Sequence, residues 1–353
     1  MAANRKYLIA VINPGSTSTK LGLFKNLDPL LKNSQTHTLN SQKHSIWDQY
    51  NERLRDIQSF FRKNLDSRPD AVVGRGGLLK PVKRGTYLVN EAMIRDARAG
   101  IQGDHVSNLG CVLARDIAES YGCPAYIVDP VSVDEFEPVS RLSGHPGFER
   151  RCLSHALNLR AAAYWAAEQI GKDIEQTRFV GLHLGGGISV ACLTGGRIID
   201  VNDASNSGPF SPQRSGTLPL QPLVRLCFSG EYPESSVLSM INGRGGVYAY
   251  LGTSDLQDIE QRLEDDQVKL VWDAMIYQIA KETGAAAAAL KGEVDAVFLT
   301  GGLTKSELFV DQLCTFIRFI APVLTLPGEQ EMEAMAAGAL RVLLKKETAK
   351  TYE

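Results

Sequence analysis

The sequence predicts an α/β protein built from two halves of the same design, and three observations support this. Short apolar runs alternate with longer helical patterns along the chain. A pair of apolar runs joined by a glycine turn occurs near the start and again near the middle, and the pattern Asp-Ala-Val followed by Gly-Gly occurs twice. With 353 residues, the chain is long enough for two domains that each bury a core.

The first pair of apolar runs predicts a β-hairpin. Residues 7–13 and 18–24 have the composition of strands, and Pro14-Gly15-Ser16 is a turn between them. Near the middle of the chain, apolar runs flank Gly185-Gly186-Gly187, and a further run follows a second glycine turn. We therefore expect a three-stranded meander there, with strands at residues 179–184, 188–193 and 197–201.

The second repeated pattern is shared by one further segment of each half. Residues 70–77 and 295–302 both begin with Asp-Ala-Val and end with Gly-Gly at the same spacing. Each resembles a strand that ends in a glycine turn. One such pair can arise by chance, because apolar strands followed by glycine are common in α/β proteins. Two repeated pairs in the same order favour an internal duplication.

Helical patterns fill the segments between these strands, and glycine closes several of them. We expect residues 1–150 to form an N-terminal domain and residues 151–330 a C-terminal domain. The last helix lies within 331–353 and is expected to pack back on the N-terminal domain. Glutamates surround the start of that helix, where acidic groups suit the positive end of the helix dipole. The expected helices lie at residues 51–65, 105–121, 151–170, 268–290 and 331–346.

The overall composition is that of a soluble globular protein. Apolar residues make up 44% and charged residues 22%, with a formal net charge of −2, so nothing indicates a nucleic-acid partner. No apolar run reaches the roughly 20 residues of a membrane span, and no signal-peptide core is present, which favours the cytoplasm. The six cysteines have no C-x-x-C spacing, so we expect reduced thiols, not a zinc site.

Glycine turns are the candidate phosphate-binding elements of the chain. No G-x-x-x-x-G-K-[ST] motif occurs, which argues against a Walker-type site. A turn without Cβ atoms can instead bring several backbone N–H groups against a phosphate. Three turns qualify, at Gly15-Ser16, at Gly185-Gly186-Gly187 and at Gly301-Gly302. A structural role is the more frequent one for a single glycine turn, but an ordered set in a duplicated fold favours ATP.

Several longer motifs carry a specific resemblance that spans essentially the whole chain. The sequence resembles the butyrate kinases, which are relatives of acetate kinase. The resemblance implies the duplicated actin-like (ribonuclease H-like) ATPase fold, in which two halves face a central cleft. The motifs are Asn13-Pro-Gly-Ser-Thr-Ser-Thr-Lys20, Val73-Gly-Arg-Gly-Gly-Leu-Leu-Lys-Pro81, Val128-Asp-Pro-Val131, His155-Ala-Leu-Asn158, His183-Leu-Gly-Gly-Gly-Ile-Ser189, Gly208-Pro-Phe-Ser-Pro-Gln-Arg-Ser-Gly216 and Leu299-Thr-Gly-Gly-Leu303.

The resemblance implies reversible phosphorylation of a short-chain fatty acid by ATP, giving an acyl phosphate and ADP. Such an acid has a pKa of about 4 to 5 and is ionised at neutral pH, so it needs no general base. It needs cations and fixed donors to offset the negative charge of the two reactants. By resemblance, Arg214 neutralises the transferring phosphoryl group, His155 in an expected helix donates a hydrogen bond to it, and Asp129 organises the phosphoryl or metal site.

The resemblance also implies a magnesium ion and places the nucleotide. Glu331 matches a glutamate that helps bind Mg²⁺, although Glu329 and Glu333 are alternative matches. The first hairpin supplies Asn13, Ser16, Ser18 and Lys20 for phosphate, metal-bound water or substrate. The second domain carries the adenosine site, with phosphate held at Gly185, Gly186, Gly187, Gly301 and Gly302. The expected ligands are ATP or ADP, Mg²⁺ and a small carboxylate, in a homodimer or higher homo-oligomer.

The chain departs from acetate kinase at positions that bear on substrate choice. Val72 stands where acetate kinase has an arginine, and Arg75 stands where it has a histidine, so Arg75 is a candidate for the carboxylate contact. Gly186 replaces an asparagine, as it does in butyrate kinases. Residues 202–208 are shorter and less acidic than in most butyrate kinases. Acetate, propionate or branched acids remain alternative substrates, and a sugar kinase or an actin-like switch ATPase remain alternative functions.

Overall fold

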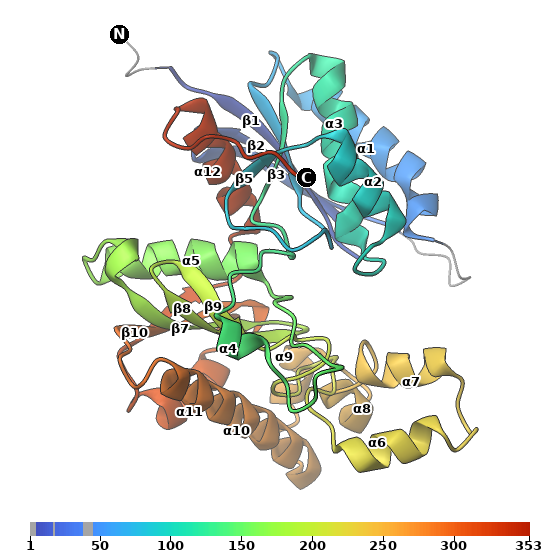
Figure 1. Ribbon diagram of the computed structural model, residues 1–353, viewed down its shortest axis with the longest axis vertical. Helices are drawn as coiled ribbons and strands as arrows, with labels where there is room; N and C mark the ends of the chain where they lie inside the picture. Colours follow the sequence, from blue (N-terminus) through green and yellow to red (C-terminus); the bar gives the residue numbers. More distant parts are fainter. Residues whose placement is uncertain (1–4, 17, 38–44) are drawn as a thin grey trace. The chain divides into compact units, whose positions relative to one another are not determined.

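The structure is a computed structural model that describes residues 5–16, 18–37 and 45–353. The chain forms two units, each with its own sheet and its own hydrophobic core (Figure 1). Unit 1 comprises residues 1–134 and 330–353, and unit 2 comprises residues 135–329. The α/β architecture predicted from the alternating patterns is therefore confirmed.

The sheet of unit 1 begins with a meander and continues with parallel strands. Its strand order is β3-β2-β1-β4-β6-β5, where β1 pairs antiparallel with β2 and parallel with β4. The predicted hairpin is β1 and β2, and the first Asp-Ala-Val segment is β4. The third meander strand, β3, has no predicted counterpart. The bounds are β1 (Leu8–Pro14), β2 (Ser18–Lys25), β3 (Asp28–Thr36), β4 (Ala71–Arg75), β5 (Thr86–Leu88) and β6 (Ala125–Val128).

Helices cover both faces of this sheet. The helices α3 and α12 both contact β1, β4 and β6, from opposite faces, and α1 and α2 pack beside α3 (Figure 1). After α12 the chain continues along β5, where Lys350 N donates to Thr86 O at 2.8 Å. The bounds are α1 (Tyr50–Asn64), α2 (Glu91–Ala99), α3 (Leu109–Tyr121) and α12 (Glu331–Leu343).

The sheet of unit 2 repeats this design. Its strand order is β11-β10-β7-β8-β9, which is the order of β6, β4, β1, β2 and β3 in unit 1. The predicted meander is present as β7 to β9, and the second Asp-Ala-Val segment is β10. The bounds are β7 (Arg178–Leu184), β8 (Ile188–Thr194), β9 (Arg197–Val201), β10 (Ala296–Gly301) and β11 (Val323–Pro327).

Unit 2 has a larger set of helices than unit 1. The helix α5 contacts β7 and β10 from one face, and α10 contacts β7 and β8 from the other face and packs against α11 (Figure 1). Shorter helices occupy the long connection between β9 and α10. The bounds are α4 (Pro138–Arg141), α5 (Ala156–Gln169), α6 (Leu220–Cys227), α7 (Glu234–Ile241), α8 (Val247–Leu251), α9 (Leu256–Glu260), α10 (Asp266–Ala289) and α11 (Glu307–Ile317).

The two Asp-Ala-Val segments make the same hydrogen bonds in their respective units. Asp70 Oδ2 accepts from Leu8 N at 2.8 Å, and Asp295 Oδ2 accepts from Arg178 N at 2.8 Å. Leu8 and Arg178 are the first residues of β1 and β7. Each aspartate also donates its own N–H to the carbonyl of the same partner. The repeated sequence pattern is therefore a repeated joint between two parallel strands.

The change from unit 1 to unit 2 comes after Asp134, earlier than the boundary at residue 150 expected from the sequence. Residues of the intervening segment bind β9 of unit 2: Glu137 N donates to Ile199 O at 3.1 Å, and Arg150 Nη2 donates to Asp200 Oδ1 at 2.8 Å. Residues 330–353 belong to unit 1.

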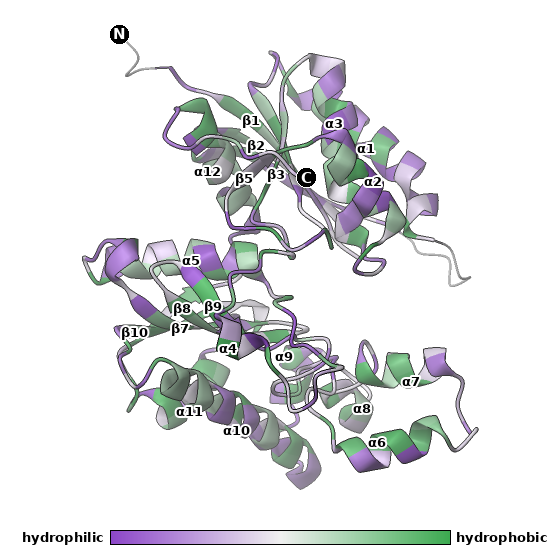
Figure 2. Ribbon diagram, in the orientation of Figure 1, coloured by the Kyte–Doolittle hydropathy of each residue, from purple (hydrophilic) through white to green (hydrophobic). Residues whose placement is uncertain are grey.

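The cores consist mainly of the strands and the helix faces turned toward them. In Figure 2 the colouring by hydropathy shows hydrophobic residues along the central strands. No helix within the described residues is long and apolar enough to cross a membrane. Cys111 and Cys192 are buried, and burial raises the pKa of each thiol to about 12, so neither is a reactive thiolate. Cys152 is also buried, whereas Cys227 is exposed.

Candidate functional site

Three predicted residues lie at one edge of the unit 1 sheet. Asn13, Arg75 and Asp129 stand at or just beyond the carboxyl ends of β1, β4 and β6, which are adjacent parallel strands. Adjacent parallel strands end at a common edge, so the fold brings together residues that are 116 positions apart between Asn13 and Asp129 (129 − 13). The sequence shows that each residue follows apolar residues of a strand. The order of the strands in the sheet explains why the three residues lie close together.

Glu331 joins this group from the first position of α12. Its carboxylate is buried, with Oε2 accepting from Asn13 Nδ2 at 2.7 Å and Oε1 lying 3.1 Å from Arg75 Nη2. Arg75 Nη1 also donates to Asn13 Oδ1 at 3.4 Å. Each oxygen of Glu331 keeps a lone pair beyond these contacts, so the residues present fit a Mg²⁺ ion bound through its water molecules. Glu333, by contrast, forms an exposed ion pair with Lys32.

The backbone of Asp129 has an unusual conformation. Its φ is 39°, a region that residues other than glycine seldom adopt, although aspartate tolerates it better than most. Two hydrogen bonds to Gly85 hold it: Asp129 N donates to Gly85 O at 3.1 Å, and Gly85 N donates to Asp129 Oδ1 at 2.7 Å. Such strain persists where the surrounding structure imposes it, commonly at functional sites.

The hairpin between β1 and β2 makes a tight turn in which Gly15 N donates to Ser18 O at 2.7 Å. Ser16 is exposed at this turn, and Lys20 lies opposite Asn13 in the register of the two strands. Arg53 of α1, which sequence reasoning missed, is fully buried beneath the turn. Its guanidinium donates to backbone carbonyls on both sides of the turn, those of Gly15, Ser16 and Ser18.

The corresponding edge of unit 2 carries two stacked histidines. The rings of His155 and His183 are 3.8 Å apart between centroids and 12° from parallel. His155 was expected inside a helix from residue 151, but α5 begins at Ala156 and His155 is its N-cap residue, with ψ of 53°. Because this ψ lies outside the helical region, the helix starts later than predicted. The His155 side chain bonds to Ser189 Oγ through Nδ1 at 3.0 Å and makes no capping hydrogen bond to the helix backbone.

Arg214 packs directly on the glycine turn after β7. A Cβ atom added at Gly187 would lie 2.6 Å from the Arg214 guanidinium carbon, so only glycine allows this contact. Ser211 Oγ donates to Gly186 O at 2.6 Å and accepts from Arg214 N at 3.1 Å. The loop of Arg214 and the turn Gly185–Gly187 are therefore one hydrogen-bonded structure, although 27 positions separate Gly187 from Arg214 (214 − 187).

Arg214 is available to an anion. Among the residues that the structure describes, it forms no ion pair, in contrast to the surface arginines that pair with carboxylates. Burial lowers the pKa of its guanidinium, and the negative charge of Asp203 opposes this effect. Asp203 itself lies next to Arg151, with Oδ2 3.3 Å from Nη2. A partly buried guanidinium with no ion-pair partner favours binding of a negatively charged group.

The remaining predicted turn lies at the end of β10. Gly301 has φ of 100°, and a Cβ there would lie 2.3 Å from Leu184 O, so a side chain cannot be accommodated. Gly302 begins the helical turn that follows. In the segment 202–208, Asn202 bonds to Val190 N and Ile188 O, which fastens the segment to β8.

Comparison with known proteins identifies the family. The model of the acetokinase family matches residues 150–338, which is more than half of the chain. Butyrate kinase 2 of Clostridium acetobutylicum is 47% identical to this chain, and the alignment covers 99% of the chain and 100% of that protein. The chain belongs to the acetokinase family. Another member, named as a probable butyrate kinase 2, from Caldanaerobacter subterraneus subsp. tengcongensis, is 45% identical over 98% of the chain and 99% of its own length.

Solved structures of an acetate kinase and of a propionate kinase have the same fold. The acetate kinase of Porphyromonas gingivalis superposes with a TM-score of 0.77, covering 96% of this chain and 100% of that one at 21% identity. A propionate kinase of Francisella tularensis also reaches 0.77, covering 94% and 98% of the two chains at 15% identity. The actin-like fold expected from the sequence is confirmed.

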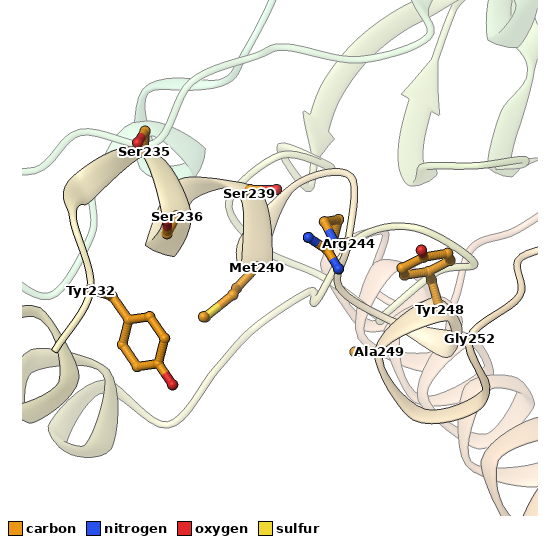
Figure 3. A pocket seen from close by; sticks show the side chains of 9 residues that line it. All are labelled: Tyr232, Ser235, Ser236, Ser239, Met240, Arg244, Tyr248, Ala249 and Gly252. Atoms are coloured by element: carbon orange, nitrogen blue, oxygen red, sulfur yellow. The ribbon is translucent and has the colours of Figure 1, made fainter. Parts of the chain in front are cut away.

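A second loop supports Arg214. Residues 243–248 donate four backbone hydrogen bonds to the Arg214 loop, among them Gly243 N to Gln213 O at 2.8 Å and Val247 N to Ser211 O at 3.0 Å. The same segment lines a pocket of about 690 Å³ in which Arg244 lies between Met240 and Tyr248 (Figure 3). None of the predicted site residues lines this pocket.

Proposed function

We propose that this member of the acetokinase family transfers the γ-phosphoryl group of ATP to the carboxylate of a short-chain fatty acid, with butanoate as the preferred substrate. The reaction is butanoate + ATP = butanoyl phosphate + ADP, and it is reversible. The observation that carries the proposal is the 47% identity to a butyrate kinase over the full length of both chains. The cytoplasm is the compartment that we propose for this reaction.

Unit 2 is proposed to bind the nucleotide and the transferring phosphoryl group. Arg214 supplies a guanidinium beside a turn of glycine N–H groups, and both can stabilise charge on the phosphoryl oxygens. His155 lies at the same edge, where its ring is held by Ser189 and by stacking on His183. Gly301 and Gly302 at the end of β10 have no side chains, so their backbone can approach the nucleotide. Because these groups are fixed by the fold, little reorganisation accompanies transfer.

Unit 1 is proposed to bind the acid and the cation. Arg75 can attract the carboxylate, and its contacts to Asn13 and Glu331 hold its guanidinium in place. The first hairpin is proposed to face the phosphate groups with Asn13, Ser16, Ser18 and Lys20. Glu331 and Asp129 are the proposed holders of Mg²⁺, which when bound would neutralise part of the charge of the triphosphate. The ionised acid attacks directly, so no residue has to remove a proton.

Trapping of the acyl phosphate tests the function. We expect purified protein with Mg-ATP and hydroxylamine to form hydroxamate from a series of acids from acetate to valerate including isobutyrate, with the highest kcat/KM for butyrate or isobutyrate. EDTA should abolish the product. Hydroxamate formed only from acetate or propionate would overturn the substrate assignment. No hydroxamate from any acid, with phosphorylation of a sugar instead, would overturn the carboxylate kinase.

We further propose that the protein is a homo-oligomer whose contact includes α6. Every residue of this helix is at least partly exposed, and Leu220, Val224 and Phe228 are 75%, 54% and 87% exposed at spacings of four residues. That spacing places them on one side of the helix, and Figure 2 shows hydrophobic residues on α6 and the neighbouring α7. A two-fold axis would pair this apolar stripe with the same stripe of a second copy of the chain, so we propose that a second copy covers it.

Charge placed on the stripe should separate the chains. We expect Phe228→Glu together with Val224→Glu to lower the mass measured by sedimentation velocity, while Phe319→Glu leaves it unchanged. Phe319 is also strongly exposed, at 81%, but lies after α11 and outside the stripe. An unchanged mass in the α6 variant, or a monomeric parent protein, would contradict the proposed interface.

A further inference from the structure

Three side chains that can bind a metal ion lie together in unit 1, and none of them belongs to the sites proposed for the nucleotide, Mg²⁺ or the acid. His37 directly follows β3, whereas Glu52 and Asp56 are on α1. One donor atom of each residue lies within 4.8 Å of the donor atoms of the other two. Glu52 and Asp56 are four positions apart, so the helix presents both carboxylates on one side. A single ion can therefore contact the end of a strand and the helix beside it.

His37 is a buried histidine with one ring nitrogen turned toward the carboxylates. Its side chain is only 5% exposed, and its Nε2 lies 2.8 Å from Thr19 Oγ1 of β2. The other nitrogen, Nδ1, lies 3.9 Å from Asp56 Oδ2, which is too far for a hydrogen bond. Among the residues that the structure describes, Nδ1 has no hydrogen-bond partner. A ring held by one nitrogen, with the other facing two carboxylates, is the arrangement of a metal-binding histidine.

The hydroxyl of Thr19 allows the form of His37 that metal binding requires. An ion bound at Nδ1 needs the hydrogen of the neutral ring to be on Nε2. Thr19 Oγ1 can accept this hydrogen, because a hydroxyl oxygen has two acceptor lone pairs and Arg53 Nη1 uses one of them at 2.8 Å. Metal-binding histidines commonly donate their second ring N–H to an oxygen in this way. Thr19 is fully buried, so this acceptor is held in place.

The charges around His37 favour a cation. The charged groups that act on its ring are the carboxylates of Glu52 and Asp56 and the guanidinium of Arg53, so two negative charges outnumber one positive charge. Arg53 directs its N–H groups to the hairpin turn, to Thr19 and to the side chain next to its helix start. Within the described part of the chain, neither Glu52 nor Asp56 forms an ion pair with a lysine or an arginine. Both carboxylates are therefore available to a metal ion.

We propose that His37 Nδ1 and the carboxylates of Glu52 and Asp56 bind a divalent transition-metal ion of the Zn²⁺ class, which joins the end of β3 to α1. One imidazole nitrogen with carboxylate oxygens suits Zn²⁺, whereas Mg²⁺ takes oxygen ligands. Three protein ligands leave the fourth tetrahedral position to water. Donor atoms around Zn²⁺ are about 3.4 Å apart, and the exposed side chains of Glu52 and Asp56 can draw in to that separation. The site stands without any catalytic activity.

Calorimetric titration of the full chain with ZnCl₂, after removal of bound metal and in excess Mg²⁺, tests the site. We expect Zn²⁺ to bind the parent protein, with the Kd raised about 10-fold or more in Glu52→Gln and in Asp56→Asn. Two control variants should leave the Kd unchanged: Asp66→Asn alters an exposed carboxylate just after α1, and His145→Gln alters an exposed histidine of unit 2. Absence of Zn²⁺ binding, or the same Kd in all these variants, would overturn the proposal.

Nitrogen-15 spectra of histidine-labelled protein test which atom of His37 binds the ion. The chain has six histidines, and His37→Gln assigns the His37 signals. We expect Zn²⁺ to shift the Nδ1 signal more than the Nε2 signal, and a His37 that is unmoved at Zn²⁺ saturation would overturn its role as a ligand.

A second substitution of Glu52 separates ligation from simple attraction of charge. Glu52→His places another imidazole at the site, so we expect it to keep the Zn²⁺ affinity that Glu52→Gln loses. An equal loss in both variants would show that Glu52 acts only through its charge, which would overturn its role as a ligand. Because the Glu52 side chain is exposed, both variants test the site even where His37→Gln does not fold.

Discussion

Replacement of Arg214 by alanine is expected to lower kcat/KM for the acid and ATP by about 10³-fold or more, the scale seen when an arginine that stabilises a transferring phosphoryl group is lost. The structure gives the physical reason. Arg214 is partly buried, packs on Gly187 and forms no ion pair within the described residues, so its charge is not neutralised in advance. Hydroxamate formation with butyrate measures the effect.

Two further variants make the Arg214 result specific. Arg214→Lys keeps the charge but loses the planar fork of N–H donors, so we expect only partial recovery of kcat. Arg318→Ala removes an exposed arginine of the same unit and should leave kcat unchanged. Added guanidinium should restore part of the activity of Arg214→Ala, which a misfolded protein would not show. Activity of Arg214→Ala close to that of the parent protein would remove this residue from the proposed mechanism.

The strands of the fold were more predictable than its helices, and burial explains the difference. The strands β1, β7 and β10 are almost entirely buried, so their apolar runs are visible in the sequence. The edge strand β3 is exposed at all but one position and has no apolar alternation, so it was missed. The helix α6 was missed for a related reason, since it has no buried face and its apolar residues do not identify a core.

The candidate site was only partly accessible to sequence reasoning. Arg214 stands in a motif that resembles one of a family and contains glycine and proline, and Glu331 follows Pro327-Gly328 at the start of an expected helix. The contacts of Asn158 could not be predicted, because its partners His183 and Thr300 are 25 and 142 positions away and meet it only through the strand order. Arg53 is a similar case, since a basic residue in an amphipathic helix indicates a solvent-exposed face, whereas here it is buried.

The buried position of Arg53 leads to the second large effect. Its guanidinium donates to the carbonyls of Gly15 and Ser16 at 3.0 and 3.3 Å, and to Ser18 O at 3.3 Å. It also donates to Thr19 Oγ1 at 2.8 Å and to Gln49 Oε1 at 2.8 Å. Because these carbonyls belong to the turn of the first hairpin, Arg53 determines the direction in which the N–H groups and hydroxyls of that turn point.

We expect Arg53→Met to lower the free energy of unfolding by about 3 kcal/mol, since several buried acceptors lose their donors. The corresponding fall in Tm is roughly 6 to 12 °C, measured by calorimetry. Arg55→Met changes an exposed arginine on the same helix and should shift Tm by less than about 2 °C. The milder Arg53→Lys should fold and show a raised KM for Mg-ATP, because one ammonium cannot reach all the acceptors.

The histidine next to Arg53 reports on the same contact by a separate measurement. Burial lowers the pKa of His37, and the positive charge of Arg53 lowers it further. His37 Nε2 lies 2.8 Å from Thr19 Oγ1, which Arg53 also contacts. Removing the charge in Arg53→Met should therefore raise the pKa of His37, which an NMR titration detects. In Arg53→Lys the positive charge is kept, so the pKa of His37 should stay lower than in Arg53→Met. A His37 pKa that is the same in both variants, together with an unchanged KM for Mg-ATP in Arg53→Lys, would mean that Arg53 neither reaches this network nor orients the turn.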